Sequence, residues 1–265
     1  MAQPYIEIAG VSQTFRRGGT VTHALDCVDL TVAAGEFVAI VGPSGCGKST
    51  LLRIIAGLLR HTGGSVRLDG RAVEGAQTNL GVVFQSPVLL EWRNVLDNVL
   101  LQLELRDLDP KPYVARAHEL LAKVGLGDFH DRRPRELSGG MRQRTAIVRA
   151  LIHDPPLLLM DEPFGALDAL TREQMRIDLE ELWMQTAKTV LFITHSIDEA
   201  VLLADRVIVM SPRPGRIEQV YDIALPRPRA LGARSDPVFV DITARITELF
   251  LSKGILRRDG GAPAP

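Results

Sequence analysis

The sequence predicts an α/β fold with a mostly parallel sheet, an N-terminal antiparallel β-subdomain and an inserted α-helical subdomain. Short apolar segments such as residues 37–41 and 190–193 alternate with segments of helical periodicity. Such strands are covered on both faces, and their alternation with helices is typical of a parallel sheet. A helical stretch at residues 94–125 interrupts the alternation. The length of 265 residues suits one large domain with a subdomain.

The first third of the chain is expected to hold most of the antiparallel strands. Residues 5–33 alternate apolar and polar positions around a glycine-rich turn at 17–19, which predicts two or three antiparallel strands. The strand at 37–41 leads through a glycine-rich loop into a helix. Further strands are expected within residues 65–84.

The rest of the chain is expected to alternate helices and strands. Prolines after Asp109 open a helix that glycines close near residue 125. The later elements are a helix from residue 139, a strand at 157–161, a long helix from about 168, a strand at 189–193, and a helix opened by Ser196 and Glu199 as a capping pair.

These elements predict three parts of the chain. The main domain is expected to cover residues 1–225, with its helical subdomain at about 86–155. A Pro- and Arg-rich linker and a short amphipathic helix follow in residues 226–256, and residues 257–265 are expected to be disordered.

The composition predicts an intracellular protein that does not bind nucleic acid. Lys and Arg number 31 against 32 Asp and Glu, so the basic excess of a phosphate-backbone binder is absent. The two cysteines, Cys27 and Cys46, cannot form a disulfide framework and lack zinc-site spacing. The sequence has no signal-peptide pattern, and its apolar runs are far shorter than the ~20 residues of a membrane-spanning helix. Any membrane role is expected to be peripheral.

Residues 42–49 match the phosphate-binding motif G-x-x-x-x-G-K-[ST] between a strand and a helix. The glycines let backbone N–H groups turn toward phosphate oxygens, and the helix N-terminus adds a positive dipole end. Lys48 is placed for the β- and γ-phosphates and Ser49 for Mg²⁺. The motif predicts a P-loop NTPase core. The residues expected to bind the nucleotide here are Gly42, Pro43, Ser44, Gly45, Cys46, Gly47, Lys48, Ser49 and Thr50.

The strand at 157–161 ends in two carboxylates, Asp161 and Glu162. Catalytic groups gather at the C-terminal ends of parallel strands, so Asp161 is the candidate ligand of Mg²⁺ and Glu162 the candidate general base for an attacking water. Two solvated acids at a strand end are the simpler alternative, which the phosphate-binding motif disfavours.

The segment Leu-Ser-Gly-Gly-Met at 137–141 resembles the signature of ATP-binding-cassette (ABC) ATPases. Taken alone, Ser138 is also a good N-cap for a helix that begins with Gly139 and Gly140. The resemblance implies that this helix start binds the γ-phosphate of a nucleotide held by the opposite subunit of a head-to-tail homodimer. It also implies ATP and Mg²⁺ as cofactors, and it extends over residues 5 to about 218.

Four further residues match positions of that family. Phe15 stands where the family places an aromatic that stacks on adenine, although a strand Phe can equally be core. Gln85 matches the glutamine that contacts Mg²⁺ and water, and Asp168 matches a loop at the dimer interface or is simply an N-cap. His195 matches the histidine that contacts the γ-phosphate. His195 and Glu199 could also suggest a metal pair, but a third ligand is lacking.

More narrowly, residues 89–99 and 210–216 resemble the nitrate/sulfonate/taurine importer family, with Glu91 where that family usually has Pro. The resemblance implies a subunit on the cytoplasmic face of the inner membrane, with a membrane permease as partner and, indirectly, a periplasmic solute-binding protein. The transported solute cannot be predicted from the chain. An ATP-driven clamp on a membrane complex, without transport, is the alternative function.

Two residues carry hypotheses of their own. Cys46 lies beside a helix N-terminus and Lys48, which would stabilise a reactive thiolate, or it is an inert loop filler. Trp92 lies in an apolar segment at residues 88–99 and either lines a groove for a permease helix or belongs to the local core. The flanking Glu91 and Arg93 favour the groove.

Overall fold

The computed structural model describes residues 3–229 and 231–256. The strands are β1 Ile6–Arg17, β2 Thr20–Val32, β3 Phe37–Val41, β4 Gly63–Leu68, β5 Arg71–Ala72, β6 Gly81–Val83, β7 Leu157–Asp161, β8 Thr189–Ile193, β9 Arg206–Met210 and β10 Ile217–Asp222. The α-helices are α1 Lys48–Ile55, α2 Val95–Glu104, α3 Val114–Lys123, α4 Gly139–Leu151, α5 Ala169–Thr186, α6 Ile197–Leu203 and α7 Pro237–Ser252. Short 3₁₀ turns occur at Lys111–Tyr113, Gly127–Phe129, Pro134–Glu136 and Leu231–Ser235.

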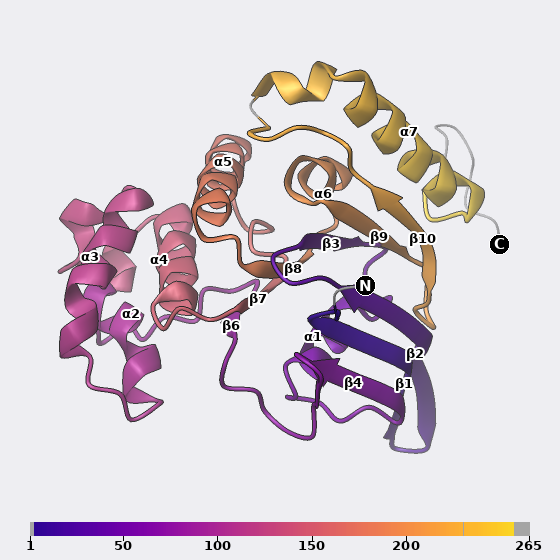
Figure 1. Cartoon of the computed structure of the whole chain (residues 1–265), viewed down its shortest axis with the longest axis horizontal. Helices are drawn as coiled ribbons and strands as arrows, with labels where there is room; N and C mark the ends of the chain where they lie inside the picture. Colours follow the sequence, from indigo (N-terminus) through magenta and orange to yellow (C-terminus); the bar gives the residue numbers. More distant parts are fainter. Residues whose placement is uncertain (1–2, 230, 257–265) are drawn as a thin grey trace.

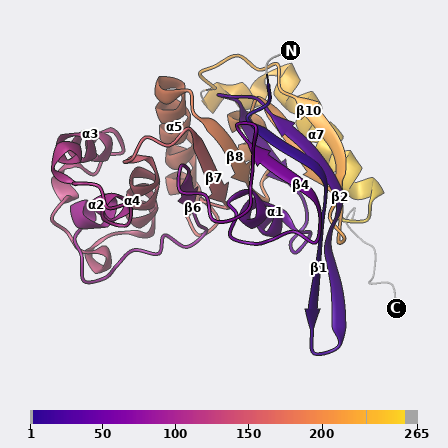
Figure 2. The same cartoon turned by 60° about the horizontal axis from the view of Figure 1, so that its bottom comes forward.

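The described strands form two sheets, which confirms the predicted fold class. The larger sheet has the order β10-β9-β3-β8-β7-β6 and is parallel except for β10. The smaller, antiparallel sheet has the order β2-β1-β4-β5. The long β1–β2 hairpin extends beyond the rest of the molecule (Figure 2). The N-terminal strands therefore form the antiparallel part and the apolar strands the parallel part.

All five residues of β3, at the centre of the larger sheet, are apolar because both faces of this strand are covered. Phe37 and Ala39 face a core shared with α4, α5 and α6, whereas Val38 and Ile40 face a second core with α1 and the antiparallel sheet. Every residue of β3 is buried. The C-terminal end of this strand is thus fixed from both sides, and the phosphate-binding loop begins there.

Helices α2, α3 and α4 lie together on one side of the sheet (Figure 1). The segment before α3 forms a 3₁₀ turn at Lys111–Tyr113, where the Asp109 carboxylate accepts a hydrogen bond from the Lys111 N–H. Gly125 adopts a positive φ of 69° just after α3, as a helix-ending glycine should. The proposed limits of the helical subdomain, 86–155, remain a prediction.

The C-terminal part differs most from the sequence expectation. The antiparallel pair β9–β10 was not anticipated. The expected linker is irregular, but the guanidinium of Arg229 is buried in it and donates to Val201 O and Ala204 O at the end of α6. Burial lowers the pKa of Arg229 to about 10. Helix α7 covers the outer face of α6 and β10 (Figure 1), and the tail at 257–265 lies outside the described residues.

The capping pair predicted for α6 is only half formed. The Ser196 hydroxyl accepts from the Glu199 N–H at 3.3 Å, as an N-cap should. The Glu199 carboxylate instead accepts from the Thr194 hydroxyl at 2.5 Å, and the same hydroxyl accepts from the Ser196 N–H. Thr194 therefore replaces Glu199 as the partner of the Ser196 amide.

Within the described residues, no helix has the length and hydropathy of a membrane-spanning helix.

Candidate nucleotide-binding site

The loop at residues 42–47 connects β3 to α1 and presents backbone amides. Gly47 stands at the N-cap of α1 with φ 112°, and no side chain caps the helix. A Cβ on Gly47 would lie 2.6 Å from Leu25 Cδ2 and 2.8 Å from Ala24 O, so only glycine fits. The first N–H groups of α1 are therefore available to an anion, as a phosphate site requires.

Lys48 is held close to its own loop. Its ammonium donates to Gly42 O at 2.8 Å and Pro43 O at 3.1 Å, and the residue is buried. An ammonium has three protons, so two bonds to the loop leave one for a ligand. Lys48 is thus a cation held in a fixed position in the pocket lining.

Ser49 and Asp161 join α1 to the end of β7. The Ser49 hydroxyl donates to Asp161 Oδ1 at 2.9 Å. Burial, the largest influence, raises the pKa of Asp161, and the nearby Glu162 adds to it. A hydroxyl and a partly buried carboxylate form a donor set suited to a hard cation.

Glu162 lies at the centre of the predicted catalytic residues. Its Oε2 accepts from Gln85 Nε2 at 3.1 Å and lies 3.4 Å from His195 Nδ1. Its own backbone has a positive φ of 45°, which is costly for a non-glycine residue, and its N–H bonds to Ile193 O at 2.9 Å. Three loops that follow β6, β7 and β8 therefore bring these side chains together.

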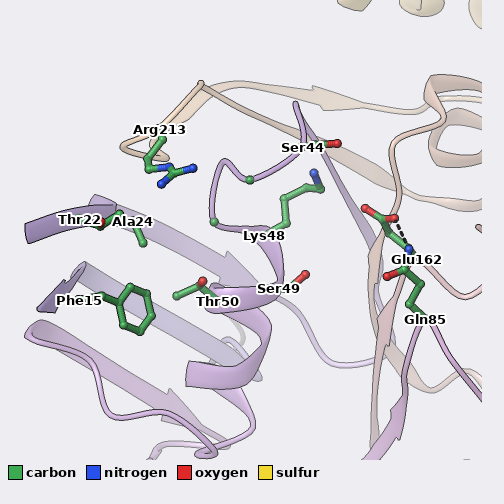
Figure 3. A pocket seen from close by; sticks show the side chains of 12 residues that line it. Phe15, Thr22, Ala24, Ser44, Lys48, Ser49, Thr50, Gln85, Glu162 and Arg213 are labelled. Atoms are coloured by element: carbon green, nitrogen blue, oxygen red, sulfur yellow. Dashed lines mark hydrogen bonds between the residues drawn. The ribbon is translucent and has the colours of Figure 1, made fainter. Parts of the chain in front are cut away.

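Lys48, Ser49, Gln85 and Glu162 line a pocket of about 460 Å³, whereas Asp161 and His195 are not among its lining residues. Figure 3 shows Phe15 at one end and Lys48, Gln85 and Glu162 toward the other. The lining residues are Phe15, Thr22, Ala24, Ser44, Gly45, Gly47, Lys48, Ser49, Thr50, Gln85, Glu162 and Arg213. Phe15 is 39% exposed, so the alternative of a core phenylalanine is wrong. The size and the loop suit a nucleotide with its base near Phe15.

Other predicted site residues lie away from this pocket. Ser138 caps α4 by accepting from Met141 N–H at 3.3 Å, and Asp168 caps α5 by accepting from Thr171 N–H at 3.0 Å. Ser138, Gly139 and Asp168 are exposed. Ser138 and Asp168 are therefore both N-caps. The roles of these two residues at a subunit interface remain predictions.

Two pocket residues on β2 and one on a later loop were missed. Thr22 and Ala24 line the pocket beside Phe15 because β1 and β2 are paired, and Arg213 reaches it from the loop between β9 and β10. Residues 210–216 stood out in the sequence only for their resemblance to importers. Neither spacing nor residue type linked Arg213 to the phosphate-binding loop.

The hypothesis of a reactive Cys46 is wrong. Cys46 is 1% exposed and belongs to the core beneath the phosphate-binding loop. Burial raises the pKa of its thiol and outweighs the lowering effect of Lys48. The side chain of Cys46 therefore packs as a small apolar group. The metal pair of His195 and Glu199 gains no third ligand, because no three His, Cys, Asp or Glu side chains of the described residues are grouped so that they could hold a metal ion.

The loop at residues 86–94 is called the docking loop below, after the role that the sequence predicts for Trp92. Buried side chains hold its inner side, and its outer side is exposed. Arg149 on α4 donates to Pro87 O at 2.8 Å and Val88 O at 2.7 Å. Asn98, fully buried, bonds to Leu90 N–H, Leu90 O, Arg93 O and Asn94 O. Trp92 is 72% exposed, so its alternative as core is wrong.

The fold and the pocket together define a nucleotide-binding protein with a phosphate-binding loop at the end of a parallel sheet. The family description "ABC transporter" matches residues 25–165. The chain is 48% identical to the taurine import ATP-binding protein TauB of Rhizobium johnstonii, over 95% of this chain and 98% of that protein. It is 48% identical to TauB of Pelagibacter ubique, over 77% of each.

Two solved structures of one bacterial ABC transporter cassette, MJ0796, are also similar. A dimeric structure matches with a TM-score of 0.73 at 35% identity, covering 82% of this chain and 98% of that one. A dimeric post-hydrolysis state bound to ADP and phosphate matches with a TM-score of 0.72 at 33% identity and the same coverage. The chain belongs to the ABC transporter family and is an ATP-binding ATPase of that family.

Proposed function

We propose that this chain is the ATP-hydrolysing subunit of an importer and energises a membrane permease for a small sulfonate such as taurine. The observation that carries the proposal is the convergence of Lys48, Ser49 and Glu162 on one pocket. The names of the relatives support import and the solute class. An ATPase subunit does not touch the solute, so its own site cannot discriminate among sulfonates.

Ser49, Asp161 and Gln85 would hold Mg²⁺. These residues offer hydroxyl, carboxylate and amide oxygens, which are the ligands that Mg²⁺ prefers. Gln85 uses its amide nitrogen on Glu162, which leaves its amide oxygen for a metal. Burial raises the pKa of Asp161, and a bound cation would stabilise its charged form. When bound, Mg²⁺ neutralises charge on the phosphates.

Glu162 is the general base for hydrolysis. Gln85 and His195 both contact its Oε2, so the carboxylate is oriented while Oε1 is left to accept a proton from water. Lys48 and the amides at the start of α1 stabilise the negative charge on the transferred phosphate. His195 Nδ1 faces Glu162 and the side chain is 53% exposed, which leaves Nε2 for the γ-phosphate.

A second copy of the chain completes each site. Ser138, Gly139 and Gly140 begin α4 outside their own pocket, and Ser138 and Gly139 are exposed. A helix N-terminus that faces a partner's nucleotide can bind its γ-phosphate, and Asp168 then lies at the interface. The dimeric cassette structures are consistent with this arrangement.

The docking loop contacts the permease. Trp92 and Val88 are 72% and 61% exposed, and an exposed Trp beside apolar residues is typical of an interface anchor. A hollow of about 400 Å³ lies next to it, lined among others by Val88, Glu91 and Gly139. The subunit then sits on the cytoplasmic face of the inner membrane, and a periplasmic solute-binding protein delivers the solute.

Uptake by the reconstituted complex tests this function. The chain is assembled in proteoliposomes with the permease and the solute-binding protein encoded beside it, and uptake of radiolabelled taurine is measured with MgATP inside. Taurine should accumulate with the wild type and not with Lys48→Ala. If MgATP is hydrolysed in the complex without uptake of taurine or of an alkanesulfonate, the proposed solute class is wrong.

A further inference from the structure

Arg213 lines the nucleotide pocket and has no part in the mechanism described above. We propose that Arg213 binds the nucleotide and that its guanidinium contacts the α-phosphate. This inference rests on the proposed placement of the base near Phe15 and of the outer phosphates at Lys48. It assigns a ligand contact to the loop between β9 and β10.

The loop that carries Arg213 is fastened to the strand beside the pocket. Gly215 N–H donates to Ala24 O at 2.9 Å, and Asp26 N–H donates to Gly215 O at 3.1 Å. The Ser211 hydroxyl bonds to Pro212 O and Pro214 O and accepts from Arg216 N–H at 2.9 Å. The backbone on both sides of Arg213 is therefore fixed, and ordering this loop adds little to the entropic cost of ligand binding.

The same loop packs directly on the phosphate-binding loop. A Cβ on Gly215 would lie 2.1 Å from Cys46 O, so only glycine permits this approach. A Cβ on Gly45 would lie 3.4 Å from Arg213 Nη2. Figure 3 shows the guanidinium over the space between the Phe15 ring and the phosphate-binding loop. A nucleotide with its base on Phe15 and its outer phosphates at Lys48 must pass its α-phosphate through that space.

The charges around Arg213 leave it free to bind an anion. Arg216, three residues later, is paired with Asp26. Arg213 forms no ion pair with any residue that the structure describes, and the carboxylate in its pocket, Glu162, lies at the opposite end in Figure 3. A planar guanidinium with several N–H donors matches the geometry of a phosphate group.

Nucleotide affinity tests the assignment without relying on turnover. Dissociation constants of ATP, ADP, UTP and inorganic tripolyphosphate are measured by calorimetry for the wild type, Arg213→Gln, Arg213→Lys and the control Arg71→Gln. Arg71 lies on β5 and is exposed, outside the pocket. Melting temperatures verify that each variant is folded.

Arg213→Gln should weaken ATP, ADP and UTP equally, by on the order of 10-fold, because a charge-assisted hydrogen bond to phosphate is lost. Tripolyphosphate also has a phosphate at the α-position and should weaken by about the same factor. Arg213→Lys should fall in between, and Arg71→Gln should match the wild type. Unchanged ATP affinity in folded Arg213→Gln would overturn the proposal. So would an unchanged affinity for tripolyphosphate, which would place the contact on the ribose or the base, or a loss that depends on the base. Failure of the wild type to bind any nucleotide would instead contradict the proposed function.

Discussion

The phosphate-binding loop and the docking loop both follow strands of the larger sheet, but they are held in different ways. The phosphate-binding loop is shaped by its own glycines and backbone, and Lys48 bonds back to its carbonyls. The docking loop is shaped by side chains from elsewhere, Arg149 on α4 and Asn98 on α2. The first loop presents backbone amides to the nucleotide pocket, whereas the second exposes Trp92, for which we propose a contact with the permease.

This difference separates the two functions in space. Val88 in the docking loop adopts a φ of 44°, a strained conformation for a β-branched residue, and Arg149 bonds to its carbonyl. Ser138 is the N-cap of α4, and Arg149 lies in the last turn of the same helix. This one helix therefore extends from the predicted dimer interface to the docking loop. We therefore expect a change at Trp92 to affect partner binding and to leave the chemistry of the isolated subunit nearly unchanged.

The largest expected effect is on hydrolysis. Glu162→Gln keeps the shape of the side chain but removes the proton acceptor, so steady-state ATPase activity should fall by on the order of 10²-fold or more. ATP should still bind, and the dimer should be trapped closed, as measured by gel filtration with MgATP. Glu74→Gln, at an exposed position outside the nucleotide pocket, is the matched control. Activity of Glu162→Gln within a few-fold of wild type would remove Glu162 as the base.

The next effect concerns the interior of the docking loop. Asn98→Ala removes four hydrogen bonds from a fully buried side chain and leaves Leu90 N–H without its acceptor. The free energy of unfolding should fall by about 3 kcal/mol. Urea denaturation measures it, with Asn79→Ala, at an exposed position, expected within about 0.5 kcal/mol of wild type. A small loss in Asn98→Ala would mean that the loop is shaped by its own backbone.

A smaller effect concerns the thiol beneath the phosphate-binding loop. Since burial raises the pKa of Cys46, its thiolate fraction at pH 7 is low, and maleimide should modify it at least about 10-fold more slowly than the exposed Cys27. Its rate should rise as the pH approaches the raised pKa. Mass spectrometry of Cys27→Ser and Cys46→Ser variants follows each site separately. Fast labelling of Cys46 that MgATP blocks would show that this loop opens readily.

The contrast between a loop shaped by its own residues and a loop shaped by distant side chains also explains how much the sequence could predict. The phosphate-binding loop, the two acids after β7 and the apolar strands are contiguous patterns, and the structure has these elements where they were expected. Arg213, Arg149 and Arg229 could not be assigned, because their partners are backbone groups or a pocket brought close only by the fold. Cys46 was misjudged because its sequence neighbours indicate a positive environment, whereas three-dimensional burial decides its pKa.

The Trp92→Ala variant tests the separation of the two loops most directly. Trp92 is 72% exposed, so its loss should cost the isolated subunit less than about 0.5 kcal/mol and shift its melting temperature by less than about 2 °C. Isolated ATPase activity should stay within about 2-fold of wild type, the usual range for a surface change outside the site. Co-purification with the permease and transport-coupled ATPase activity should drop together. A large loss of melting temperature with permease binding retained would contradict the account.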